Sequence, residues 1–250
     1  DAINHAFAVV ATGGFSTKNL SIASFGSPLI NIVTIFFMFL SSIHFGIIFM
    51  VFASRSLKPL NNPVLKFYAG TILVAALLVA FSLKMSSAGF TWGESFMTGF
   101  FQVVSSISTT GFAISDNNTW PLFACIITVL ITVPCGMAGS TTGGIKMDRM
   151  LLMFKSVGQQ VKSSMHPSSI NQVHIGNHML GNNEIYPHLV FIGLYFITIA
   201  ASMALTILSG MDVQNSLASS ISCLSNVGPA MESAGTMGNY SGVPVLAKIV

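Results

Sequence analysis

Long apolar stretches alternate with shorter and more polar ones along the chain. A membrane-crossing helix needs about 20 mostly apolar residues. Four stretches approach or exceed that length, namely residues 29–53, 64–83, 120–137 and 185–208. A fifth apolar run begins at Val243. The chain is therefore expected to cross a membrane several times.

Three shorter runs, rich in Ser and Ala, lie outside these spans, and each leads to a glycine. One run opens the chain, and the others cover residues 92–108 and 212–225. At about 1.5 Å per residue, the run at 92–108 falls short of the ~30 Å hydrocarbon core, so it enters the membrane without crossing it. Each run is predicted to be a pore helix that ends at a bend, and the bends lie at Gly13, Gly111 and Gly228.

A span, a half-length helix, a glycine bend and a second span together form a re-entrant pore loop. Such exposed backbone is tolerated at membrane depth only where it lines a protein-enclosed cavity. Three copies predict a conduction pathway built from internal repeats, in which backbone carbonyls replace the water around a cation. For any single glycine, a membrane turn or a helix-packing contact is the alternative. The predicted pathway residues are Ala11, Thr12, Gly13, Thr109, Thr110, Gly111, Asn226, Val227 and Gly228.

The span at 120–137 runs into a glycine-rich segment that does not favour helix. Each glycine costs about 1 kcal/mol relative to alanine, and Pro134 lacks an N–H donor. Helix-forming sequence resumes at Ile145 and continues to about Lys162. The segment is predicted to be an irregular loop inside the membrane, with a simple helix kink as the alternative. Its residues are Ala138, Gly139, Ser140, Thr141, Thr142, Gly143 and Gly144.

Composition and charge support the membrane assignment and orient the chain. Charged residues make up 7% of the sequence and hydrophobic residues 52%, whereas roughly a quarter of the residues in soluble domains are charged. If all pore loops enter the membrane from one side, seven of the ten basic residues lie on the other side of the membrane. Five of the seven acidic residues lie on the side of the pore loops. The positive-inside rule then places the basic segments in the cytoplasm and the pore loops outside.

Three of these basic residues follow the glycine-rich segment. Lys146, Arg149 and Lys155 are predicted to be cytoplasmic anchors or partner contacts. Lys146 and Arg149 could instead pair with Asp148, Glu184 or a partner protein.

The ordered filter strings, together with the break at residues 139–144, resemble the Trk/Ktr/HKT potassium transporter superfamily, most closely its bacterial TrkH potassium-uptake subunits. The stretch His166, Pro167, Ser168 supports this narrower resemblance, which covers essentially the whole chain. It implies an all-α polytopic membrane fold in which four span–pore helix–span units surround a pseudo-fourfold ion pore.

About two and a half of these four units are expected in this sequence, which looks like the middle and later part of a longer protein. Residues 1–54 would hold the pore helix, filter and second span of repeat two. Residues 55–165 would form repeat three with the intramembrane loop. Residues 166–250 would form repeat four, incomplete at its C-terminal end.

The resemblance also implies a function. The cargo would be potassium ions, the filter would use backbone carbonyls, and the intramembrane loop would be the gate; neither enzyme activity nor an organic cofactor is expected. The full Thr-Val-Gly-Tyr-Gly signature of dedicated potassium channels is missing, so looser selectivity against sodium is expected. The protein would be a multi-pass component of the bacterial inner membrane, with its pore loops facing the periplasm.

The implied partners are membrane lipid, a second copy in a homodimer and a cytosolic TrkA-like ring of nucleotide-binding regulatory subunits; no nucleic acid is expected. The basic segments would dock the ring, although anionic lipid accounts for their charge as well. Two other functions are alternatives. A sodium-coupled solute symporter also uses broken helices but does not predict repeated glycine loops. An intramembrane protease would need a histidine at the depth of Ser140, and none is expected there.

Overall fold

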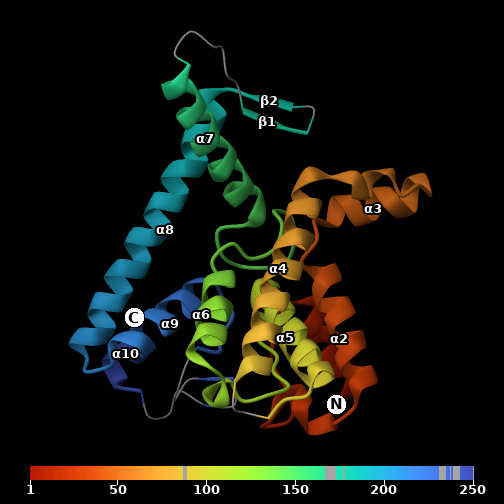
Figure 1. The fold of residues 1–250 in the computed structure, drawn as a ribbon, viewed down its shortest axis with the longest axis vertical. Helices are drawn as coiled ribbons and strands as arrows, with labels where there is room; N and C mark the ends of the chain where they lie inside the picture. Colours follow the sequence, from red (N-terminus) through yellow and green to blue (C-terminus); the bar gives the residue numbers. More distant parts are fainter. Residues whose placement is uncertain are drawn as a thin grey trace.

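The computed structural model describes residues 1–86, 89–166, 173–176, 178–230, 235–236, 238 and 243–249. Ten α-helices are present in this part of the chain: α1 Ala2–Val10, α2 Pro28–Ser41, α3 Phe45–Ser54, α4 Pro63–Met85, α5 Trp92–Ile107, α6 Leu122–Ile131, α7 Met147–Met165, α8 Asn182–Leu208, α9 Val213–Leu224 and α10 Val245–Ile249 (Figure 1). Three short 3-10 helices add Ser21–Phe25 (η1), Lys58–Asn61 (η2) and Asn117–Thr119 (η3). The predicted helical membrane fold is confirmed.

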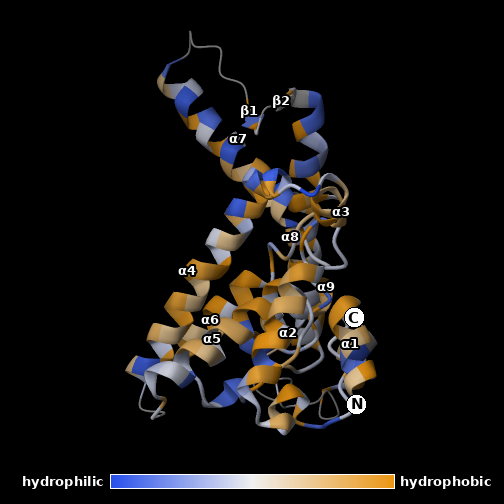
Figure 2. Ribbon diagram, turned by 90° about the vertical axis from the view of Figure 1, so that its right-hand side faces the viewer, coloured by the Kyte–Doolittle hydropathy of each residue, from blue (hydrophilic) through white to orange (hydrophobic). Residues whose placement is uncertain are grey.

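Two helices, α4 and α8, are long and apolar enough by themselves to cross a membrane. Helix α4 starts where predicted because Pro63 occupies its first turn and the Asn62 side chain accepts hydrogen bonds from the amides of Val64 and Leu65. Apolar residues dominate α2, α4 and α6 (Figure 2). Hydrophilic residues gather on α7 and at the end of the molecule where α7 lies. This division fits a membrane-embedded body with a polar extension.

The short helices α5 and α9 form as predicted, and a side chain caps the N-terminus of each. Thr91 and Glu94 make a capping box at α5, and the two hydrogen bonds from Thr91 lower the pKa of the Glu94 carboxyl. Asp212 accepts a hydrogen bond from the amide of Gln214 at the start of α9. Helices α4 and α5 cross very closely, since a Cβ on Gly99 would lie 3.0 Å from the backbone nitrogen of Ala80.

The span predicted at residues 29–53 is not one straight helix, and this prediction is corrected. Helices α2 and α3 meet at an angle of 96°, and α3 projects sideways from the body (Figure 1). The hydroxyls of Ser41 and Ser42 donate hydrogen bonds to carbonyls of the preceding helical turn. These bonds compete with the helical backbone pattern, and α2 ends here. His44 then starts α3 by accepting the amide of Gly46 on Nδ1 at 2.8 Å.

The expectation of an all-α chain needs one addition, a two-stranded antiparallel hairpin of β1 Val173–Ile175 and β2 His178–Leu180. The hairpin lies beside α7 at the polar end of the molecule (Figure 1). A buried cluster of Leu152, Val173 and Ile185 joins it to α7 and α8. Of the motif residues 166–168, only His166 lies within the described part of the chain.

Candidate functional site

Helices α1, α5 and α9 all end in the same backbone motif. In each, the capping residue is right-handed and the next residue is left-handed: Thr12 with φ 50°, Thr109 with φ 53° and Asn226 with φ 66°. The following amide then bonds back five residues, in the pairs Gly13–Ala8, Thr110–Ser105 and Val227–Ser222. This is the Schellman arrangement, in which a left-handed residue closes the helix. The three predicted pore helices are therefore local structural repeats.

This equivalence shifts the predicted register of the first loop by one residue. Counting from the left-handed residue, Gly14 corresponds to Gly111 and Gly228, and all three have positive φ, at 65°, 79° and 99°. Gly13 corresponds instead to Thr110 and Val227. The structure thus places Gly14, not Gly13, at the position of the other two glycines.

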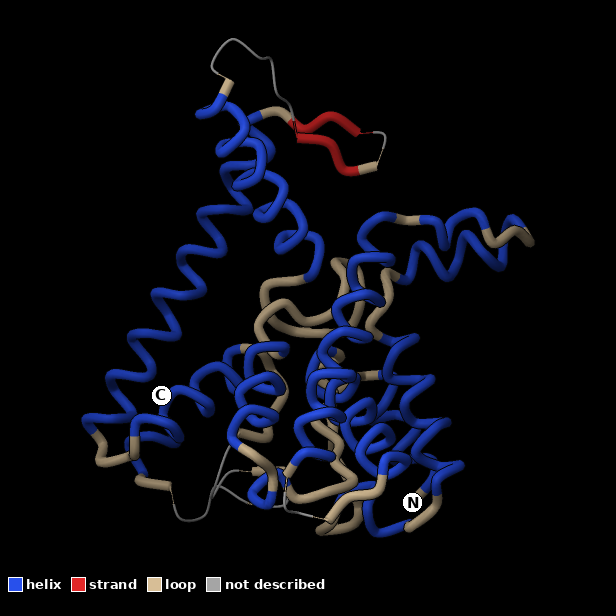
Figure 3. The backbone as a smooth tube through the Cα atoms, in the orientation of Figure 1, coloured by secondary structure: helices blue, strands red, loops and turns tan. Residues whose placement is uncertain are grey.

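The loops contact one another directly at two of these glycines, Gly14 and Gly111. A Cβ atom on Gly14 would overlap the carbonyl oxygen of Thr110, and one on Gly111 would overlap the carbonyl oxygen of Val227. The glycines are therefore needed for close approach as well as for backbone conformation. Figure 3 shows non-helical segments gathered in the interior of the molecule, between the ends of the short helices.

The glycine-rich segment at residues 138–144 touches all three loops. The Thr12 hydroxyl donates to the Thr141 carbonyl at 3.1 Å, and the Gly143 amide donates to the Thr109 hydroxyl at 3.1 Å. A Cβ on Gly143 would overlap the carbonyl oxygen of Ser225 in the third loop. The sequence places these residues far apart, and the fold brings them together.

This segment is an extended excursion between two helices. Helix α6 ends at Ile131 and α7 begins at Met147, so the alternative of a simple kink is wrong. Hydrogen bonds close the base of the excursion: Met147 donates its amide to the Gly136 carbonyl at 2.9 Å, and Ile145 to the Val133 carbonyl at 3.3 Å. The Asp148 carboxylate accepts the Ala138 amide at 2.6 Å. Both ends of the loop are therefore fixed.

The break between α2 and α3 packs against the same loop. The Met137 amide donates to the Ser42 carbonyl at 2.9 Å, and the Phe45 amide donates to the Gly139 carbonyl at 3.1 Å. The ring of His44 lies 2.7 Å from the position that a Cβ on Gly139 would take. The expectation that no histidine lies at this depth is therefore wrong.

No protease-like pair follows from this proximity. The Ser140 hydroxyl donates to the Met137 carbonyl at 2.5 Å and lies 2.8 Å from the Thr142 hydroxyl. His44 Nδ1 is engaged with the Gly46 amide. Within the residues that the structure describes, no cluster of three or more His, Cys, Asp or Glu side chains is arranged to hold a metal ion.

The three basic residues after the loop point in different directions. Lys146 turns back and donates to the Thr142 carbonyl and hydroxyl and to the Ser140 carbonyl. Arg149 lies over the Phe191 ring at 4.1 Å and donates to the Ile145 carbonyl. Lys155 donates to the His174 carbonyl of the hairpin at 2.6 Å. In the described ranges, no acidic side chain forms an ion pair with any of the three.

Two elements of the site have no counterpart in the sequence predictions. The first is a pair of serines placed six residues before a loop glycine. The Ser105 hydroxyl donates to the Phe112 carbonyl and the Ser222 hydroxyl to the Pro229 carbonyl, both at 2.6 Å. Each serine fixes the backbone just beyond its glycine, and the equal Ser–Gly spacing was the available signal.

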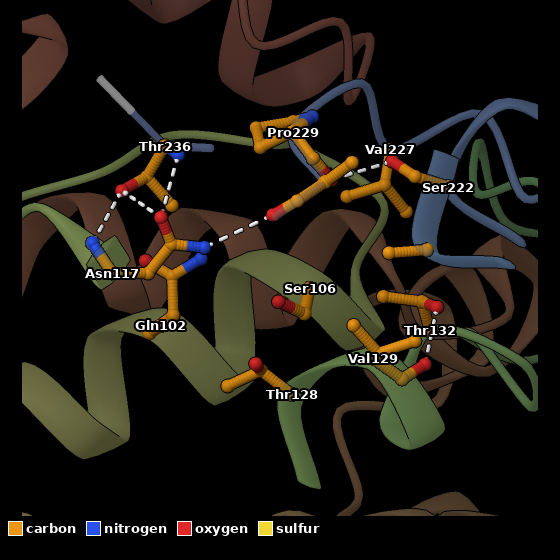
Figure 4. Close-up of a pocket in the computed structure, with 12 residues that line it drawn as sticks. Gln102, Ser106, Asn117, Thr128, Val129, Thr132, Ser222, Val227, Pro229 and Thr236 are labelled. Carbon is orange, nitrogen blue, oxygen red and sulfur yellow. Dashed lines mark hydrogen bonds between the residues drawn. The ribbon is translucent and has the colours of Figure 1, made fainter. Parts of the chain in front are cut away.

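The second element is Asn117, which ties the segments after the second and third loops together. Its Nδ2 donates to the Ala230 carbonyl at 3.0 Å, while its Oδ1 accepts the Thr236 amide at 3.0 Å (Figure 4). Asn117 is buried, and it lines a polar cavity of about 20 Å³, room for roughly one water molecule. The other lining residues are Gln102, Ser106, Thr128, Val129, Thr132, Ala218, Ser222, Val227, Pro229, Ala230 and Thr236.

Comparison with known proteins identifies the family. Residues 1–250 match the TrkH family, described as "Cation transport protein". The chain is 34% identical over 236 residues to the Trk system potassium uptake protein TrkH of Escherichia coli (strain K12), an alignment that covers 92% of this chain and 48% of that protein. It is 29% identical to the TrkH of Halomonas elongata, with 99% of this chain and 51% of the relative covered.

A solved structure gives the same result. The crystal structure of the potassium transporter TrkH from Vibrio parahaemolyticus matches with a TM-score of 0.91 and 28% identity, over 100% of this chain and 53% of that one. The chain spans about half the length of the curated relatives that it matches. These relatives are membrane transporters and not enzymes. The chain therefore belongs to the TrkH family of cation transport proteins.

Proposed function

We propose that this protein takes up potassium across the bacterial inner membrane by a channel-like route, through a filter of backbone carbonyls gated by the loop at residues 138–144. The printed names of the relatives support potassium as the cargo. The observation that carries the filter is the helix end repeated three times, which brings two of the three glycines, Gly14 and Gly111, against a carbonyl of the neighbouring loop.

The chemistry of these strands suits a monovalent cation. Backbone carbonyls offer partial negative charge without a fixed anion that would trap the ion. The C-terminal ends of α1, α5 and α9 add the negative ends of their dipoles at the same place. In the corrected register the coordinating strings are Thr12–Gly13–Gly14, Thr109–Thr110–Gly111 and Asn226–Val227–Gly228. A fourth equivalent loop would complete a pseudo-fourfold ring.

The loop at residues 138–144 is the proposed gate because it forms hydrogen bonds to the first two of these strands and, at Gly143, packs closely against the third. A segment with its ends fixed and its centre against the filter obstructs ions until it moves. Movement of α7, which begins directly after the loop, would supply the release. The assignments of residues 1–54, 55–165 and 166–250 to three repeats stay part of this proposal, supported by one repeated helix end in each.

Deleting residues 139–143 tests the gate. We expect the deletion protein, reconstituted into liposomes, to show higher basal potassium flux than the wild type, with a similar preference for potassium over sodium. The filter strands lie outside the deletion, so selectivity should persist. Wild-type basal flux from a correctly inserted deletion protein would disprove the gate.

A sodium-coupled solute symporter is the second candidate, favoured by the broken helices α2–α3 and α6–α7. Liposomes free of organic solute distinguish the two functions. Potassium flux under those conditions supports the channel-like route, whereas flux that requires both sodium and a solute supports the symporter.

The proposed partners are a second copy of the protein, membrane lipid and a cytosolic TrkA-like ring. The polar extension of α7 and the β1–β2 hairpin is the proposed docking surface for the ring, with the bond from Lys155 to His174 holding the two elements together. The pore loops would then face the periplasm. Cross-linking from cysteines on α7 to the purified ring, with anionic vesicles as competitor, separates ring contact from lipid contact.

A further inference from the structure

Lys146 combines an unusual backbone with an unusual side-chain direction. It precedes the first residue of α7 and has φ 78° and ψ 136°, a region that residues with a Cβ rarely occupy. Its side chain does not extend toward the polar end of the molecule. It returns to the glycine-rich loop and places its ammonium among loop oxygens.

The oxygens that surround this ammonium are those expected of a potassium site. They comprise the Thr142 carbonyl, the Thr142 hydroxyl at 3.0 Å and the Ser140 carbonyl at 3.4 Å. All are neutral dipoles, as in carbonyl-lined cation filters. In these bonds, the ammonium of Lys146 carries the single positive charge that a bound monovalent ion would carry.

The cluster also lies close to the proposed filter strands. The carbonyl of Thr141, which lies between Ser140 and Thr142, accepts a hydrogen bond from the Thr12 hydroxyl. The amide of Gly143, which follows Thr142, donates to the Thr109 hydroxyl. The loop oxygens therefore lie within a few residues of two of the three filter strands. On the proposed route, an ion that has passed those strands would meet this cluster next.

We propose that the oxygens of Ser140 and Thr142 form a monovalent-cation site that the Lys146 ammonium occupies while the loop is closed, and that a permeating ion competes with Lys146 for it. This inference rests on the proposed function, since it specifies how the gate is held. The Asp148 bond to Ala138 fixes one end of the loop, and the ammonium holds its centre. Displacement of the ammonium frees only that centre.

The first arm of the test removes the tethered charge. Basal potassium flux into liposomes is compared for the wild type, Lys146→Met and Lys58→Met; Lys58 is an exposed lysine in η2 and serves as the charge-matched control. We expect Lys146→Met to raise basal flux roughly tenfold, because a lost charge-assisted contact shifts a two-state equilibrium by about one decade. Lys58→Met should stay within about twofold of the wild type.

The second arm begins with Lys146 in place, so its first comparison does not depend on the folding of Lys146→Met. A cysteine replaces Thr141 in a Cys223→Ser background, in which Cys125 and Cys135 are buried. Its labelling rate by a soluble maleimide is measured in potassium chloride and in choline chloride at equal ionic strength. We expect faster labelling in potassium, and fast labelling in both salts once Lys146→Met is added.

The outcomes separate this inference from the gate itself. Salt-independent labelling with Lys146 present, or wild-type flux from Lys146→Met, overturns the cation site. If deletion of residues 139–143 still raises potassium flux in that case, the loop remains the proposed gate and the proposed role of Lys146 is wrong. An absence of potassium flux from the wild type overturns both.

Discussion

Among single residues, the two adjacent glycines of the first loop have different structural requirements. Gly14 has φ 65°, and a Cβ there would overlap the Thr110 carbonyl. Gly13 has no such backbone requirement, and a Cβ there would lie 3.3 Å from a ring carbon of Phe15, a side chain that is largely exposed. A methyl group is therefore tolerated at one glycine and not at the other.

This difference predicts unequal effects of alanine. Gly14→Ala should reduce potassium flux about tenfold or more and destabilise the protein by about 1–2 kcal/mol, because a left-handed backbone costs that much for a residue with a Cβ. Gly13→Ala should change flux by no more than about twofold. Rubidium uptake into liposomes and thermal unfolding in detergent measure both variants. Equal losses would contradict the shifted register.

Asn117 gives the second prediction at this scale. Asn117→Ala removes the side-chain hydrogen bonds to Ala230 and Thr236, and it leaves the Ala230 carbonyl and the Thr236 amide without these partners. We expect a loss of about 1–3 kcal/mol in stability and a lower potassium-to-sodium permeability ratio, because the second and third loops are no longer tied. Asn118→Ala, at the exposed neighbouring position, is the matched control. An unchanged permeability ratio in Asn117→Ala would leave Asn117 with a purely structural role.

At the level of helices and loops, local sequence predicted most helices well. The spans expected at residues 29–53 and 120–137 were predicted poorly, since the first is broken and helix α6 ends at Ile131. Helices α4, α5, α8 and α9 begin and end within a few residues of their predicted bounds, since caps, prolines and apolar content act locally. The break between α2 and α3 was placed inside a continuous span. Its conformation depends on hydrogen bonds from Met137 and Phe45 that join the break to the distant loop. A local pattern carries no signal for such bonds.

The segments that form the site could be predicted from their residue types, but the alignment of the first loop with the other two could not. The three short helices and the glycine-rich loop were found from residue types alone. The pair Gly13–Gly14 offered two alignments, and only the position of the left-handed residue distinguishes them. The direction of the Lys146 side chain was also hidden, because a lysine after a span is most simply an anchor. Backbone conformation decided both questions.

For the whole molecule, the two ends differ in their basic residues, and this difference predicts an orientation in the membrane. The turns that lead into α5 and α9 and the segment containing η3 lie at one end, and α3, α7 and the hairpin lie at the other (Figure 1). Basic residues such as Lys58, Lys155 and Lys162 belong to the second end. The positive-inside rule therefore predicts that this end faces the cytoplasm.

Single cysteines at Asn118 and at Ser164, both exposed positions, test this orientation in a background without the three native cysteines. We expect the cysteine at 118 to react with an impermeant maleimide in intact cells, and the cysteine at 164 only after permeabilisation. Labelling of both cysteines from the same side would show that the chain crosses the membrane an even number of times between residues 118 and 164. That result would contradict the predicted arrangement of spans. Inverted labelling would keep the threading and place the loop of residues 138–144 on the periplasmic side of the filter. A cytosolic ring acting through α7 could not then reach the gate, so this result would remove the proposed regulation while leaving the filter intact.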